Sequence, residues 1–157
     1  MVDDPMQAFF ELHKDLPREG PGETADIQWA ANIAGLSQNA QMADVGCVVA
    51  FSEVCWFTDT PSDRARALWE ADGYVVQNEA GIADQIDAAG YEVLGRRRLS
   101  DAAWEAYYGP LDARIAALRP GADDALPAVL DEAEEEAACW RAHRDEFGYL
   151  LHVVRPK

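Results

Sequence analysis

Two short segments combine residue types that bind small molecules at the edge of a sheet. In the first, Asp44 and Gly46 flank Val45, and Cys47 follows. An acid and a glycine at the end of a buried strand lie where a ligand meets the carboxyl edge of an α/β sheet. An ordinary strand that ends in a turn has the same pattern, so this segment alone leaves both interpretations open.

The second segment, residues 51–57, places polar groups beside aromatic rings. Ser52 and Glu53 supply a hydroxyl and a carboxylate, and Trp56 and Phe57 supply flat apolar surface. Small-molecule pockets combine these features, although aromatic residues at such positions also form ordinary cores. Cys55 has no activating neighbour, which indicates a small buried hydrophobic residue rather than a nucleophile.

Other catalytic chemistries lack their sequence signatures. The three histidines are far apart, and none has a partner at metal-ligand spacing. The three cysteines form no C-x-x-C pair, and their odd number does not suggest a disulfide framework. There is no serine elbow, no P-loop and no complete G-x-G-x-x-G. The sequence therefore predicts no metal site and favours a reducing cytoplasm.

Charge limits the classes of partner. The 157 residues carry 29 acidic and 13 basic side chains, which gives a formal net charge of −16. Such a field repels phosphate backbones and anionic membranes. The first residues lack the basic charge of a signal peptide, and no apolar run approaches the ~20 residues of a membrane helix. These features predict a cytoplasmic protein that binds neither nucleic acid nor membrane.

The elements that position these segments alternate between helix and strand. An acid before Pro5 begins a helix, and Thr24 caps a second one that stops at Gly35. The remaining expected elements are buried strand material over 42–52, helices over 62–73 and 78–90, a strand over 91–94, helices over 100–120 (continued at Pro110) and 125–147, and a strand over 149–154. This order predicts an α/β layered fold.

Several segments together resemble the class I S-adenosylmethionine-dependent methyltransferases, in particular a small bacterial branch of that family. Residues 9–13 look like its helical cap, and Arg18-Glu19-Gly20-Pro21-Gly22 looks like its R-x-G-P-G loop. Residues 43–47 are similar to its first strand and to the opening of its D-x-G-C-G-x-G cofactor loop. Residues 50–57, 89–91, 104–109 and 148–149 continue the match.

The resemblance implies a truncated Rossmann-like methyltransferase sheet with flanking helices. Residues 1–157 then form one methyltransferase-like domain, with a helical cap over 1–36 and an incomplete α/β core over 40–157. In the family the cofactor loop continues beyond the position of Cys47, whereas here Val48 follows directly. The resemblance thus implies an internal deletion on the order of 90 residues, or about three βα units.

The resemblance also implies S-adenosylmethionine as the cofactor and a small molecule as the methyl acceptor. It implies that the following residues bind the cofactor: Arg18, Gly20, Pro21, Gly22, Asp44, Gly46 and Cys47. The acceptor pocket would contain Ser52, Glu53, Trp56 and Phe57. No residue is identified as the general base.

Two other interpretations stay open. In the second interpretation the chain is an inactive, internally deleted remnant of a methyltransferase. Such a remnant acts at most as a binding module, or it forms a homodimer through strands that lost their neighbours in the sheet. A third interpretation is an acidic partner-binding module. It rests on the net charge and on the acidic block over 131–136, which is most simply a solvated helix face.

Overall fold

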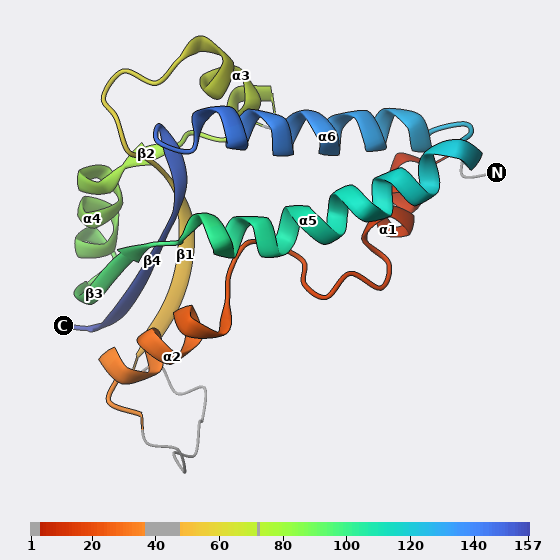
Figure 1. Ribbon diagram of the computed structural model, residues 1–157. Helices are drawn as coiled ribbons and strands as arrows, with labels where there is room; N and C mark the ends of the chain where they lie inside the picture. The colour runs from red at the N-terminus through yellow and green to blue at the C-terminus, as the bar shows by residue number, and fades with distance from the viewer. Residues whose placement is uncertain (1–3, 37–47, 72) are drawn as a thin grey trace.

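The protein alternates helices and strands along the chain, as its apolar pattern predicts (Figure 1). The computed structural model describes residues 4–36, 48–71 and 73–157. Their elements are α1 (Pro5–His13), α2 (Thr24–Ile33), β1 (Val49–Trp56), α3 (Asp63–Ala71), β2 (Gln77–Asn78), α4 (Glu79–Ala88), β3 (Tyr91–Arg98), α5 (Asp101–Leu118), the short 3-10 helix η1 (Arg119–Gly121), α6 (Leu126–His143) and β4 (Phe147–Pro156).

Four strands form one mixed sheet in the order β2-β1-β4-β3. β4 lies antiparallel to both β1 and β3, and β1 and β2 are parallel. Between Val93 and Gly95 the register of β3 shifts, so β3 carries a bulge at this point. β4 is the most apolar strand of the sequence, and from Phe147 to Val154 nearly every residue is buried. The chain therefore has the α/β fold that the sequence predicts.

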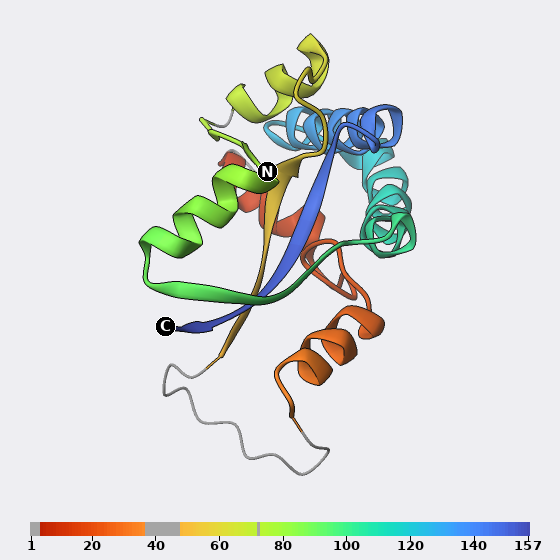
Figure 2. The same cartoon turned by 90° about the vertical axis from the view of Figure 1, so that its left-hand side faces the viewer.

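Helices cover the two faces of the sheet unequally. On one face, α4 packs Ile82 and Ile86 against Leu150 and Val154 of β4. The other face carries the larger core with α5 and α6 (Figure 2). Side chains alternate between the faces along each strand. On β1, Val54 therefore joins the large core, whereas its neighbour Cys55 joins the core under α4.

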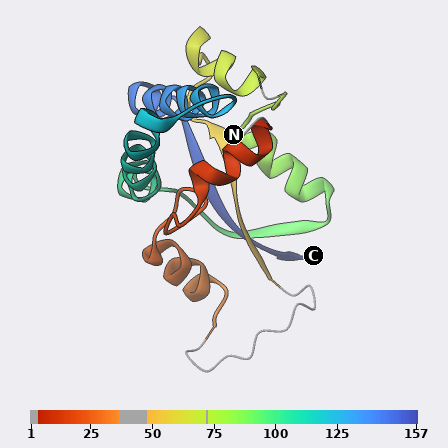
Figure 3. The same cartoon turned by 90° about the vertical axis from the view of Figure 1, so that its right-hand side faces the viewer.

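The N-terminal helices pack on the side of the sheet that α5 and α6 occupy. α1 contacts both of these helices (Figure 3), with Ala8 and Leu12 buried. α2 is fixed to β3 by an ion pair of 2.9 Å between the buried Asp26 and Arg97. The N-cap of α2 is Glu23 rather than the predicted Thr24, because Glu23 and Asp26 form a reciprocal capping box.

The predicted boundary between the last helix and the last strand was too late. α6 ends at His143, and β4 has begun by Phe147. Residues 144–146 form a turn between them, in which the amide of Glu146 donates to the carbonyl of His143 at 2.8 Å. The amide of Phe57 donates to the carbonyl of Glu146 at 2.7 Å, so this turn is joined to the end of β1. None of the helices in the described ranges is both long and apolar enough to cross a bilayer.

Candidate functional site

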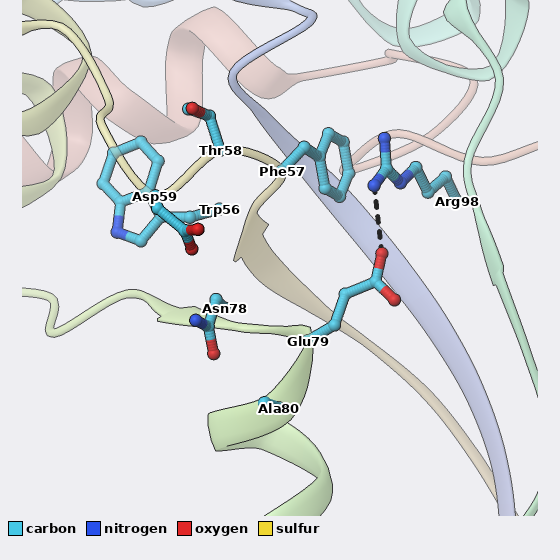
Figure 4. A pocket seen from close by; sticks show the side chains of 8 residues that line it. All are labelled: Trp56, Phe57, Thr58, Asp59, Asn78, Glu79, Ala80 and Arg98. Carbon is cyan, nitrogen blue, oxygen red and sulfur yellow. Dashed lines mark hydrogen bonds and ion pairs between the residues drawn. The ribbon is translucent and has the colours of Figure 1, made fainter.

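A polar and aromatic pocket lies where the carboxyl end of β1 meets the amino end of α4. We call it the end pocket; its volume is about 240 Å³ (Figure 4). It is lined by Trp56, Phe57, Thr58, Asp59, Asn78, Glu79, Ala80 and Arg98. These residues come from β1 and the segment after it, from β2, from the first turn of α4 and from the last residue of β3.

The floor of the end pocket is a junction between a short strand and a helix. β2 pairs with the end of β1 through Cys55↔Gln77 and Trp56↔Asn78. Asn78 then caps α4, because its side-chain oxygen accepts from the amide of Gly81 at 2.9 Å. Strand pairing and helix capping therefore fix Glu79 in the first turn, with its side chain directed at β3.

Arg98 forms the opposite wall and is held by two contacts. Its guanidinium lies 3.8 Å from the centre of the Phe57 ring, a cation–π distance. It also donates to a carboxylate oxygen of Glu79 at 3.0 Å. Arg96 approaches the same carboxylate at 3.7 Å. Glu79 is thus balanced by two arginines, whereas Asp59 has no ion pair within the described part of the chain.

The Phe57 ring has its position because residue 148 has no side chain. A Cβ atom on Gly148 would lie 3.0 Å from Cε2 of Phe57 and 3.3 Å from its Cζ. Only glycine therefore allows the ring to lie this close to β4.

Glu146 holds the segment that leads from the end pocket to α3. One carboxylate oxygen accepts from the amide of Ser62 at 2.6 Å, and the other lies 2.8 Å from Nδ1 of His143. The Ser62 hydroxyl caps α3 through the amide of Ala65 and lies 3.1 Å from the same histidine nitrogen. The Ser62 amide, and after it His143, lower the pKa of Glu146 below its usual range.

Replacing Glu146 by glutamine is expected to reduce the free energy of unfolding by about 1 kcal/mol at neutral pH. The charged carboxylate that accepts two hydrogen bonds is replaced by a neutral amide, so these bonds are weakened or lost. A lowered folded-state pKa stabilises the fold above the unfolded carboxyl pKa of ~4.3, and this stabilisation is lost as the pH falls. Urea unfolding at about pH 7 and about pH 3 measures both effects. Asp145→Asn, at an exposed neighbour, is the control. An equal deficit at both pH values would contradict the role given to the charge.

A second cavity runs beside the amino half of β1, on the α4 face of the sheet. We call it the edge groove; its volume is about 330 Å³. Its walls are mostly apolar: Val49, Phe51, Glu53, Ile82, Gln85, Ile86, Ala89, Tyr91 and Val154. Phe51 in turn stacks on the buried ring of His152, with 5.3 Å between ring centres.

The residues predicted for the acceptor pocket do not share one cavity. Trp56 and Phe57 line the end pocket, Glu53 lines the edge groove, and Ser52 lines neither. Because side chains alternate along a strand, Ser52 and Glu53 lie on opposite faces of the sheet. The four residues, which lie within six positions of the sequence, therefore do not form one pocket.

The residues predicted for the cofactor site are only partly described. Asp44, Gly46 and Cys47 lie outside the described residues. The loop over 18–22 packs on the start of α5, where the amide of Gly22 donates to the carbonyl of Ala103 at 3.0 Å. Arg18, Gly20, Pro21 and Gly22 line neither the end pocket nor the edge groove.

Five polar residues of the end pocket were missing from the sequence-based prediction: Thr58, Asp59, Asn78, Glu79 and Arg98. Two signals point to three of them in retrospect. Asn78 was identified as the start of a helix, which places Glu79 in the first turn. The predicted strand ended at Leu94, yet β3 continues through three arginines to Arg98. Period-two alternation places Arg96 and Arg98 on one face.

Outside the end pocket, the described part of the chain has no metal-binding cluster and no activated thiol. Within the described ranges, no group of three or more His, Cys, Asp or Glu side chains comes close enough to hold a metal ion. Cys55 is buried, and desolvation together with the charge of Glu79 raises the pKa of its thiol to about 11. This thiol therefore stays protonated, as expected of a small buried hydrophobic residue.

Comparison with protein-family models and with curated proteins gives no match. Several solved structures are similar in fold, and they include the following three. YjhP from E. coli matches with 16% identity and a TM-score of 0.54, over 81% of this chain and 56% of its own. A SAM-dependent methyltransferase from Geobacter sulfurreducens, in complex with S-adenosyl-L-homocysteine, matches with 17% identity and a TM-score of 0.55, over 82% of this chain and 52% of its own.

A SAM-dependent methyltransferase from Thiobacillus denitrificans, also in complex with S-adenosyl-L-homocysteine, matches with 13% identity and a TM-score of 0.55, over 82% of this chain and 52% of its own. The four-stranded mixed sheet with its flanking helices thus resembles the Rossmann-like fold of methyltransferases. This chain spans about half the length of the structures that it matches. At these identities the likeness concerns the fold alone.

Proposed function

We propose that this chain is a methyltransferase-like module that binds a small organic cation in the end pocket and does not transfer methyl groups by itself. The observation that carries this proposal is the composition of the end pocket. Trp56 and Phe57 supply aromatic surface beside two carboxylates, Asp59 and Glu79, and one cation, Arg98. Aromatic rings with adjacent carboxylates are typical of sites for amines and quaternary ammonium groups.

The charge balance favours a cation over an anion. Arg98 is already held by Glu79 and Phe57, so an anionic ligand would have to displace an existing ion pair. Asp59 lies beside Trp56 across the pocket and has no competing cation within the described residues (Figure 4). The net charge of −16 also raises the local concentration of cations around the protein.

The described residues do not fit S-adenosylmethionine. The end pocket, at about 240 Å³, is smaller than the roughly 300–1,000 Å³ of typical ligand sites. Neither this pocket nor the edge groove includes a residue of the loop over 18–22. The proposed module therefore acts without this cofactor.

Methyl transfer to a small molecule is the second candidate function. It is favoured by the fold and by two similar structures that contain S-adenosyl-L-homocysteine. In that case the cofactor would be held by Arg18, Gly20, Pro21, Gly22, Asp44, Gly46 and Cys47. The first proposal includes an internal deletion after Cys47, because the match covers 82% of this chain but only 52% of each of these two neighbours.

Three probes of similar size separate the effect of ligand charge from that of ligand size: 2-phenylethylamine, 2-phenylethanol and phenylacetate. We expect the amine to bind about tenfold more tightly than the alcohol, and phenylacetate to bind least. Calorimetry gives the affinity, and shifts of the Trp56 indole N–H signal locate the site. Asp59→Asn should remove the preference for the amine, whereas Asp123→Asn makes the same charge change elsewhere on the chain and should not. Tightest binding of phenylacetate would overturn the proposal.

The same calorimeter tests the second candidate with S-adenosylmethionine and S-adenosyl-L-homocysteine. Saturable one-to-one binding at micromolar affinity would contradict the misfit between this cofactor and the chain and would favour the second candidate. No binding at millimolar ligand, from protein with a cooperative unfolding transition, would exclude the enzymatic function for this chain.

A further inference from the structure

β1 has a strand on only one side for most of its length. It pairs with β4 from Val49↔Val154 to Trp56↔Phe147. On its other side, β2 pairs only with Cys55 and Trp56. Within the described residues, the backbone from Val49 to Val54 therefore presents unpaired N–H and C=O groups along one edge.

β3 and the free part of β1 differ in how well they are protected against pairing with a strand of another molecule. β3, at one end of the sheet, has a bulge near Leu94 and three successive arginines, which are typical defences against edge-to-edge association. The free part of β1 has no bulge in its pairing with β4, no proline and no basic residue. Its single charge is Glu53, whose carboxylate accepts from the amide of Val54 at 3.1 Å and so covers one donor.

The edge groove continues this open edge with apolar surface. Val49 and Phe51 of β1 face Ile82 and Ile86 of α4 across it. Val49 is 39% exposed, an unusual fraction for a valine within a sheet. A strand added to β1 would place alternate side chains next to this groove, while its backbone pairs with the free edge.

We propose that the free edge of β1 pairs antiparallel with the same edge of a second copy of this chain, so that the two sheets become continuous. A two-fold axis at Phe51 uses the free stretch on both copies. Phe51 then lies opposite Phe51 of the second copy, and Val49 lies opposite Glu53. This register keeps the two carboxylates apart and forms an aromatic cross-strand pair.

The distribution of charge makes this edge a more favourable place for two copies to associate than the rest of the surface. Two chains of net charge −16 repel one another, so they associate best where each surface carries few charges. The free edge carries only Glu53, and its strand sequence is available on every copy. Isologous pairing satisfies both edges at once.

Sedimentation velocity over a range of protein concentrations tests this interface, with salt as a second variable. We expect a monomer–dimer equilibrium. Its dissociation constant should decrease when the NaCl concentration is raised from about 0.05 M to about 0.5 M, because salt screens the repulsion between the chains. If the protein stays monomeric at all concentrations up to about 1 mM in high salt, the proposal is overturned. The dissociation constant would then exceed about 1 mM, which is an association free energy weaker than ~4 kcal/mol.

Paired substitutions test the register. Val49→Lys places a cation opposite Glu53 twice per dimer and should lower the dissociation constant about tenfold, whereas Val49→Glu should raise it by a similar factor. Val93→Lys and Val93→Glu make the same charge changes on β3, at the other end of the sheet, at a side chain that is also 39% exposed. If the Val49 and Val93 variants behave alike, the interface is elsewhere and the proposal fails. Unchanged thermal unfolding of each variant monomer verifies its fold.

Discussion

Replacing Trp104 by alanine is expected to lower the free energy of unfolding by about 3–5 kcal/mol, the cost of removing a large aromatic side chain from a packed core. Trp104 lies on α5 and is 3% exposed. Its ring stacks on Trp140 of α6, with 5.0 Å between ring centres, and on Tyr149 of β4 at 4.9 Å. A single side chain thus joins two helices to the central strand.

Urea unfolding followed by circular dichroism measures this loss, and Trp69→Ala is the matched control. Trp69 is half-buried on α3, and its indole N–H is buried without a hydrogen-bond partner. Removing this ring also removes an unsatisfied donor, so the loss should be smaller than at Trp104. Equal losses at both positions would contradict the central role of the α5–α6 aromatic cluster.

Local signals in the sequence predicted where most helices begin and end. Asp4, Asn78 and Ser100 each accept a hydrogen bond from a backbone amide of the following helix. Such caps depend on only four successive residues, and the sequence displays them directly. Pro110 lies within one continuous α5, as the prediction of a continued helix requires.

The errors in the strands have a tertiary cause. The arginines that follow Leu94 look like the end of a strand, yet each has a partner that is distant in the sequence. Arg97 pairs with Asp26 of α2, and Arg98 pairs with Glu79 of α4. These ion pairs, together with the pairing to β4, allow charged residues to continue β3.

The end pocket shows why the fold was easier to predict than the site. Its walls come from four elements, so no contiguous motif encodes it. The resemblance to methyltransferases supplied the fold, which the structural neighbours share. It also directed attention to a cofactor loop, of which residues 44, 46 and 47 lie outside the described ranges. Residues 51–57 looked like one cluster because alternation between faces is invisible in a list of residue types.

Replacing His152 by leucine is expected to raise the free energy of unfolding by about 1–2 kcal/mol at neutral pH, because it removes a buried polar atom without a partner. His152 is fully buried on β4. Its Nδ1 donates to the carbonyl of Leu150 at 3.2 Å, which leaves Nε2 as an unpaired acceptor. Burial, assisted by Arg96 and opposed by Leu150 and Glu79, lowers the pKa of this imidazole below its usual value.

The lowered pKa also makes the stability of the protein depend on pH. At pH values above ~6.5, the pKa of histidine in the unfolded chain, the ring is neutral in both states and contributes nothing to the pH dependence of the free energy of unfolding. Below it the unfolded chain takes up the proton first, so the stability falls until the folded ring also titrates. Urea unfolding between about pH 7.5 and about pH 5 should therefore show a shallower decline for His152→Leu than for the parent protein. His152→Gln removes the titration but keeps a polar group, and should flatten the decline without the gain at neutral pH. A parent-like slope in both variants would show that another group controls the pH dependence.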